Sequence, residues 1–205
     1  MTTAERILGC ALQLFNQRGI ENVGIREIAA TLDMRVGNLT YYYPTKNDVI
    51  GAIAMQLRDL NNRTIVVQDG MHMMEFLNMQ KQVMKNQSEY ICLFRSFVNL
   101  FENHNEIATA YKKTEKHRFS TLHKILNELV ENKYMRQLKV TEVEFLVSTL
   151  SFINRFWSSE AAVTYRNLSF KKQQSHYLEL IARLLQPYST KKGMSQIDEF
   201  INQLQ

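Results

Sequence analysis

The stretch of residues 19–46, GIENVGIREIAATLDMRVGNLTYYYPTK, decides the fold of this chain. Apolar residues at helical spacing predict two short helices here, over residues 25–32 and 36–42. The inward-facing residues are Ile28, Ala29, Met34 and Leu39. Asp33, between the helices, is of a type that tolerates the left-handed conformation of a tight turn, and Pro44 ends the second helix. This spacing predicts a helix-turn-helix with a packed interior.

The second helix of such a motif can lay its outer face in the major groove of DNA, which is wide enough to admit one helix. Gly37 allows a close approach of the backbone, and Asn38 is placed to hydrogen-bond a base edge. Lys46 starts the next helix, where its charge and the helix dipole both favour a phosphate. The residues expected to contact DNA are Arg26, Arg35, Val36, Gly37, Asn38, Thr40, Tyr41, Tyr42 and Lys46. Tyr43 is expected in the core.

Both halves of this stretch resemble the N-terminal domain of the TetR/AcrR (tetracycline-repressor-like) family. Residues 19–29, GIENVGIREIA, are similar to its Gly-x4-Ser/Thr-apolar-x2-Ile-Ala segment. Residues 37–46, GNLTYYYPTK, are similar to its Gly-x-Leu-Tyr-x-His-Phe-x-x-Lys recognition helix. Gly24 stands where the family usually has Ser or Thr, Thr40 where it usually has Tyr, and Arg35 where a capping Ser is common. The resemblance implies a ligand-responsive transcriptional regulator, usually a repressor, that binds an inverted-repeat operator as a dimer.

The rest of the chain is expected to be helical as well. The 205 residues are 45% hydrophobic and 22% charged and include only seven Gly and two Pro, without sustained strand-like alternation. We therefore expect an all-α protein. Together with the family resemblance, this implies a three-helix DNA-binding domain at residues 1–47 and a helical bundle for ligand binding and dimerisation at residues 48–205. The other helices are expected at residues 3–18, 45–67, 71–85, 88–102, 105–133, 141–165 and 170–185, with a short tail helix after Pro187. Thr141 and Glu144 are expected to form a capping box.

The helix expected at residues 141–165 is apolar nearly all round, so it must be covered on two sides. Pairing this helix and the next one with their symmetry mates gives a four-helix bundle, which is a self-complementary dimer interface. The residues expected in that interface are Leu150, Ile153, Leu178, Ile181 and Leu185. The rival interpretation is that the apolar stripe packs only within the subunit.

Methionines and aromatic residues are frequent between residues 71 and 157, and they have two interpretations. They line an adaptable pocket for a small, mainly apolar ligand, or they fill an ordinary core. The candidate ligand-binding residues are Met74, Phe94, Phe97, Phe101, Tyr111, Phe119, Phe156 and Trp157.

Charge and side-chain chemistry narrow the function further. The net charge is +5, but residues 1–65 carry seven Lys and Arg against six Asp and Glu, so any DNA face depends on how these charges are arranged. Cys10 and Cys92 lie in apolar helical patterns and are expected to be free thiols. The sequence lacks a nucleophile–base pair, a phosphate loop and metal-ligand spacing, so we expect no catalysis, cofactor or metal. Without a signal peptide or membrane span, the cytoplasm is the expected location.

Two alternative functions stay open at this point. In one, the C-terminal domain engages a protein partner and DNA acts as the effector. In the other, the chain is a ligand-binding helical protein whose DNA-binding domain is degenerate, as the residues at Gly24 and Thr40 allow.

Overall fold

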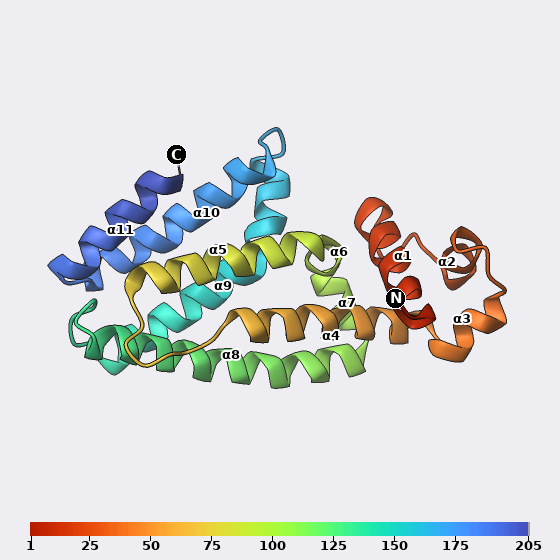
Figure 1. Ribbon diagram of the computed structural model, residues 1–205, viewed down its shortest axis with the longest axis horizontal. Coiled ribbons are helices and arrows are strands. Elements are labelled where there is room, and N and C mark those ends of the chain that lie inside the picture. The colour runs from red at the N-terminus through yellow and green to blue at the C-terminus, as the bar shows by residue number, and fades with distance from the viewer. Residues whose placement is uncertain (205) are drawn as a thin grey trace. The chain divides into compact units, whose positions relative to one another are not determined.

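The computed structural model describes residues 1–204, and they fold into helices (Figure 1). The α-helices are α1 (Thr3–Arg18), α2 (Ile25–Thr31), α3 (Val36–Tyr42), α4 (Lys46–Thr64), α5 (Met73–Glu89), α6 (Ile91–Arg95), α7 (Phe97–Asn103), α8 (Asn105–Glu131), α9 (Val140–Thr164), α10 (Phe170–Leu185) and α11 (Lys191–Leu204). A short 3-10 turn, Gln186–Tyr188, follows α10. Within this described part, β pairing is limited to one isolated bridge between Met135 and Ser189. The prediction of an all-α fold is confirmed.

The chain divides into two compact units. The first comprises Met1–Asn61 and Asn86–Lys112, and the second comprises Asn62–Lys85 and the chain from Lys113 onward. The boundaries fall inside α4, α5 and α8. A functional boundary at residue 47 stays a prediction. Of residues 1–204, no helix is both long and apolar enough to cross a lipid bilayer.

The first unit is built on α1, α2 and α3. Thr2 caps α1 by accepting a hydrogen bond from the Glu5 N–H at 3.2 Å, and the Glu5 carboxylate accepts one from the Thr2 N–H at 2.7 Å. Gly19 ends α1 at a φ of 85°, in the region that favours glycine. Asp33 has a φ of 51°, which confirms the predicted tight turn between α2 and α3. These local signals fix the helix-turn-helix geometry.

The start of α4 is capped by the side chains of Thr45 and Asp48. The Asp48 carboxylate accepts hydrogen bonds from the N–H and the hydroxyl of Thr45, each at 2.7 Å, and the Thr45 hydroxyl accepts one from the Asp48 N–H at 3.2 Å. Helices α2 and α3 differ, because Gly24 and Arg35 occupy their N-cap positions without a side-chain cap. The Asn38 N–H donates to the Arg35 carbonyl at 2.9 Å, so it is the N–H groups of Val36 and Gly37 at the start of α3 that no capping side chain satisfies.

The second unit buries its own apolar core, to which α5, α8, α9, α10 and α11 contribute. Helix α11 is anchored closely to the segment that follows α8. The Thr190 hydroxyl donates to the Lys133 carbonyl at 2.6 Å, and a Cβ added to Gly193 would lie 2.0 Å from the Tyr134 carbonyl oxygen. Only glycine allows this approach, which holds the tail helix on the core.

Two details of the predicted helices are wrong. The helix predicted at residues 88–102 is instead the end of α5 followed by α6 and α7, with the last break at Ser96. The capping box predicted at Thr141 and Glu144 is shifted, because α9 begins at Val140 and the Glu142 carboxylate accepts the Lys139 N–H at 2.9 Å. Glu142 also pairs with Arg136 at 2.8 Å, a contact that the local sequence does not reveal.

Candidate nucleic-acid interface

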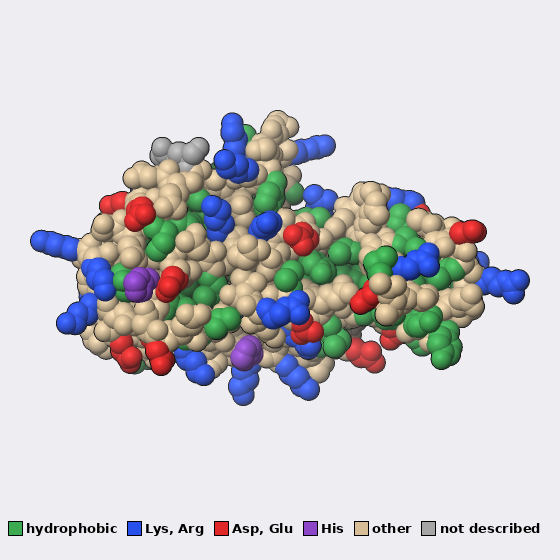
Figure 2. Space-filling model, in the orientation of Figure 1, with side chains coloured by type: hydrophobic (Ala, Val, Ile, Leu, Met, Phe, Trp, Pro, Cys, Tyr) green, Lys and Arg blue, Asp and Glu red, His purple; other side chains and the backbone are tan. Residues whose placement is uncertain are grey.

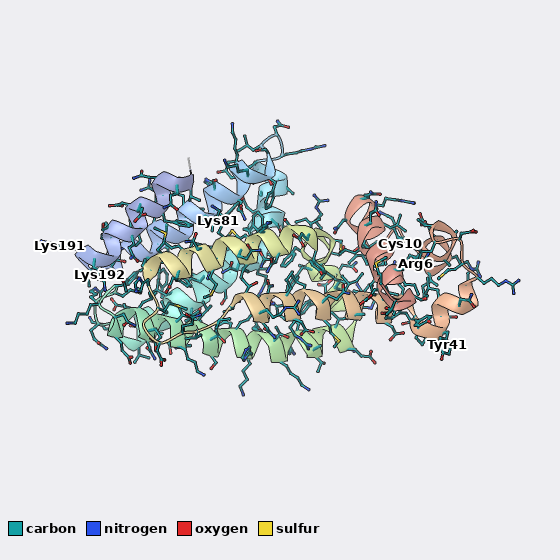
Figure 3. All side chains as sticks on the ribbon, in the orientation of Figure 1. Arg6, Cys10, Tyr41, Lys81, Lys191 and Lys192 are labelled. Atoms are coloured by element: carbon teal, nitrogen blue, oxygen red, sulfur yellow. The ribbon has the colours of Figure 1, made fainter. Side chains whose placement is uncertain are left out.

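Helix α3 separates its residues cleanly into an inner and an outer face. Leu39 is fully buried and Tyr43 is half-buried against the core of the first unit. Tyr41 and Tyr42 are 83% and 43% exposed, and their rings meet edge to face at 5.2 Å. Tyr41 is on the outer side of α3 in Figure 3, directed away from α1. The other exposed candidates are Arg26, Arg35, Val36, Gly37 and Asn38.

Gly37 is exposed and has open space around it. A Cβ at this position meets nothing within 4 Å, and its φ lies outside the range that favours glycine. Since a glycine in a helix costs about 0.5–1 kcal/mol relative to alanine, its presence has no structural explanation within the first unit. The same open space surrounds Gly24, so the Ser or Thr typical of related sequences would fit there.

Two of the residues predicted to contact DNA are less exposed to solvent than their neighbours. Thr40 is half-buried, and its hydroxyl donates to the Gly37 carbonyl at 3.3 Å. Lys46 is also half-buried, and its Nζ donates to the Glu21 carbonyl at 3.5 Å. Desolvation lowers the pKa of Lys46, while the Glu21 carboxylate acts in the opposite direction. Lys46 therefore carries its charge at the N-terminus of α4 on a side chain held against the loop after α1.

The positive charge near α3 comes from few side chains. Arg18 pairs with Glu27, which links α1 to α2 and partly neutralises both groups. Arg26 in α2 and Arg35 at the N-cap of α3 are exposed. In the part of Figure 2 that holds α1–α3, apolar side chains lie near Lys and Arg, with Asp and Glu side chains among them. A surface with one exposed helix, two arginines and a helix-terminal lysine has the features needed to contact phosphates and bases.

Two family profiles match consecutive parts of the sequence. Residues 7–53 match the profile described as bacterial regulatory proteins of the tetR family. Residues 55–197, well over half of the chain, match the profile described as bacterial transcriptional repressor. The chain belongs to the tetR family. The sequence resemblance noted at residues 19–46 is thereby confirmed, and the second match extends it to the C-terminal helices.

Individual relatives of this tetR-family chain are distant in sequence. The Bacillus subtilis protein described as "Probable HTH-type transcriptional regulator YttP" is 21% identical over 145 residues, which are 70% of this chain and 66% of that protein. A TetR-family regulator from Marinobacter aquaeolei VT8 has a TM-score of 0.92 at 17% identity, with both chains fully covered. SmeT, the repressor of the Stenotrophomonas maltophilia multidrug efflux pump SmeDEF, in complex with triclosan has a TM-score of 0.65 at 15% identity over 93% of each chain. These likenesses establish the fold.

The predicted ligand-binding residues are divided between the two units of this tetR-family chain. In the first unit Phe97, Phe101 and Tyr111 form an aromatic cluster with ring centroids 4.4–5.2 Å apart. Phe94 packs against the core of the same unit. The candidates in the second unit are Met74, Phe119, Phe156 and Trp157. The structure thus brings three of the eight together, and their role in ligand binding stays a prediction.

Trp157 is fully enclosed in the core of the second unit, near Phe170 and Tyr177. A separate surface cleft of about 410 Å³ lies in this unit between α10 and α11, and it includes none of the predicted ligand residues. Its lining is mixed, with the charged and polar Lys171, Lys172 and His176 on α10 facing the apolar Ile201 and Leu204 of α11. The cleft therefore differs in chemistry from the apolar pocket expected from the sequence.

The residues predicted at the dimer interface require a correction. Leu150, Leu178, Ile181 and Leu185 are fully buried within a single chain, and Ile153 packs partly buried against the same core. The four fully buried side chains fill the subunit core and present no surface to a second subunit, whereas a role of half-buried Ile153 in the interface stays a prediction. The periodicity assigned the inward-facing stripe of α9 and α10 to the interface, and the use of these two helices for dimerisation stays a prediction.

A different stripe of α9 is exposed and apolar. Phe145, Phe152 and Val163 are 51%, 63% and 81% exposed, and half-buried Phe156 contacts Phe152 at 5.3 Å between ring centroids. Spacings of 7, 11 and 18 residues from Phe145 keep these four on one helix face. On α10, Phe170 and Leu180 are also exposed. The sequence analysis did not single out Phe145, Phe152, Val163, Phe170 or Leu180, although the spacing along α9 was a usable signal.

Proposed function

We propose that this tetR-family chain is a ligand-responsive transcriptional regulator that binds double-stranded DNA through the outer face of α3. The observation that carries the proposal is Gly37, a helical glycine in open space at the centre of an otherwise exposed helix face. Gly9 in α1 lies in equally open space, so the open space alone does not indicate DNA contact. Gly37 differs because it lies among the exposed Arg35, Asn38 and Tyr41, where a glycine lets the backbone approach DNA closely. Membership of a family of bacterial transcriptional repressors supports the same function.

Side chains around Gly37 divide into two roles in this proposal. Asn38 is exposed and has the amide geometry that recognises adenine, so it contributes sequence preference. Arg26, Arg35 and Lys46 contact phosphates, which contributes affinity without sequence preference. Tyr41 and Tyr42 supply apolar surface for thymine methyl groups, and their hydroxyls reach phosphate oxygens.

The salt dependence of DNA binding tests this assignment. In an anisotropy titration over a range of salt concentrations, Lys46→Ala should weaken binding to every duplex and reduce the slope of log K against log salt by about one. Lys191→Ala is the matched control, because Lys191 also occupies the first position of a helix but belongs to α11 in the second unit. Equal slopes for the wild type and Lys46→Ala contradict a phosphate contact at Lys46.

We further propose that the active form is a homodimer that pairs through the exposed stripe of α9 and the neighbouring residues of α10. Phe145, Phe152 and Val163 form a row of apolar surface that a solvated monomer would expose at a cost. Two recognition helices related by a two-fold axis match an inverted-repeat operator. The dimer is thus the form that the DNA-binding proposal requires.

For the regulatory ligand we propose a small, mainly apolar molecule. The aromatic cluster of Phe97, Phe101 and Tyr111 supports a ligand of this class, and triclosan bound to SmeT is an apolar example in a protein of similar fold. A thermal-shift screen of apolar compounds tests the proposal, since a ligand that binds the folded state must raise its melting temperature. The location that suits this function is the cytoplasm.

A further inference from the structure

Asn16 on α1 forms two hydrogen bonds to backbone groups far along the chain. Its Nδ2 donates to the Glu89 carbonyl at 2.8 Å, and its Oδ1 accepts from the Cys92 N–H at 3.0 Å. All three residues belong to the first unit. The two bonds use the donor and the acceptor of a single side-chain amide, so together they fix its orientation.

The backbone groups that Asn16 binds are the ones that helices leave unsatisfied. Glu89 is the last residue of α5, and Cys92 lies in the first turn of α6. A carbonyl at a helix C-terminus and an N–H at a helix N-terminus have no partner within their own helices. Cys92 is almost completely buried, so its N–H would be costly to leave without a partner. Asn16 therefore holds the α5–α6 junction onto α1.

A second amide contact joins the same end of α5 to α4. The Asn86 Nδ2 donates to the Asn61 Oδ1 at 3.1 Å, and the two residues are 2% and 3% exposed. Helix α1 packs against α2, and α4 begins at Lys46. The end of α5 is thus connected by side-chain amides to both helices that flank the candidate DNA-binding surface.

We propose that Asn16 is a positioning residue that couples the α5–α6 junction to the helix-turn-helix, an inference that rests on the proposed DNA-binding function. A change in the junction must either move α1 with it or break both hydrogen bonds. Movement of α1 shifts α2 and α3, and with them the surface offered to DNA. Coupling of this kind is reciprocal, so DNA bound at α3 must also stabilise one arrangement of residues 89–92.

Hydrogen exchange with and without DNA tests the reciprocal effect. The full-length protein is mixed with random-sequence double-stranded DNA fragments at low salt, where sequence-independent binding is strong. In the wild type, DNA should slow amide exchange both at residues 25–46 and at residues 89–96. In Asn16→Ala the slowing at residues 25–46 should remain, while that at residues 89–96 should fall by roughly tenfold, a typical size for coupling between sites.

Two further variants separate coupling from a simple loss of structure. Asn16→Asp keeps the acceptor for the Cys92 N–H but places a carboxylate oxygen against the Glu89 carbonyl, so it should also reduce the DNA-dependent slowing. Gln17→Ala, at the exposed next position of α1, should behave as the wild type. A purely structural role would speed exchange at residues 89–96 in the free protein and leave the difference made by DNA unchanged.

The possible outcomes are distinguishable. Equal DNA-dependent slowing at residues 89–96 in the wild type, Asn16→Ala and Asn16→Asp overturns the coupling, as does slowing confined to residues 25–46 in the wild type. If DNA slows exchange nowhere in residues 25–46 of the wild type, the proposed function itself fails and the coupling fails with it.

Discussion

Gly37→Ala separates the stability of α3 from its use in DNA binding. The new methyl group meets nothing within 4 Å, and alanine favours the helix by about 0.5 kcal/mol at this early position. For a chain of this length, that gain raises the melting temperature by roughly 1–2 °C. The same methyl group pushes the backbone away from a closely docked surface. Overpacking by one methyl costs about 1–3 kcal/mol, or roughly a 5- to 150-fold rise in Kd.

Gly9→Ala is the matched control for this prediction. Gly9 lies within α1, is exposed and likewise has nothing within 4 Å of an added Cβ. It should gain stability without any change in DNA affinity. Thermal unfolding followed by circular dichroism gives the first quantity, and anisotropy titration of a labelled duplex at fixed salt gives the second. The reasoning is refuted if Gly37→Ala binds DNA as tightly as Gly9→Ala, or if it is less stable than the wild type.

Three more substitutions test the rest of the structure. Gly193→Ala places a Cβ 2.0 Å from the Tyr134 carbonyl oxygen, so it should lower the free energy of unfolding by about 1–3 kcal/mol in denaturant titrations; wild-type stability would contradict the close packing of α11. Phe152→Glu should convert a dimer into a helical monomer in sedimentation experiments at micromolar concentration, and a persistent dimer would place the interface elsewhere. The Arg136 guanidinium lowers the pKa of Glu142 from 4.5 to about 2, so the carboxylate stabilises the folded state above pH 4.5, and this contribution is lost as the pH falls towards 2. The melting temperature of Glu142→Gln should therefore be lower than that of the wild type at pH 6, and the two should converge near pH 2. A difference in melting temperature that stays constant with pH would show that the ion pair is not responsible.

Local sequence signals were sufficient for the DNA-binding part of the fold. The bounds of α1 and α3 follow from apolar spacing and from their terminal residues, and Asp33 adopts the predicted left-handed turn. Each of these features depends on contacts within a few residues, which a single sequence displays directly. The end of α5 and the start of α6 instead form hydrogen bonds with Asn16, which is more than 70 residues away in the chain. No local sequence pattern reveals such a contact.

The candidate interface of α9 shows a different limit. A helix that is apolar nearly all round has two apolar faces, and either of them can pack against the core. The periodicity of its sequence does not tell which face does so. The structure assigns Leu146, Leu150 and Trp157 to the core, which leaves Phe145 and Phe152 outside. The ligand-binding residues have the same limit. They were predicted from the frequency of Met and aromatic residues, which does not tell which aromatic rings are in contact.

Selection of bound sequences from random double-stranded DNA at moderate salt tests the central claim most directly. A dimer that presents two α3 helices should enrich an inverted repeat whose half-sites lie about one helical turn apart, roughly 34–36 Å, or a little more. Asn38→Ala should change the bases preferred within each half-site while keeping their spacing. Recovery of no motif by the wild type would contradict sequence-specific binding through α3.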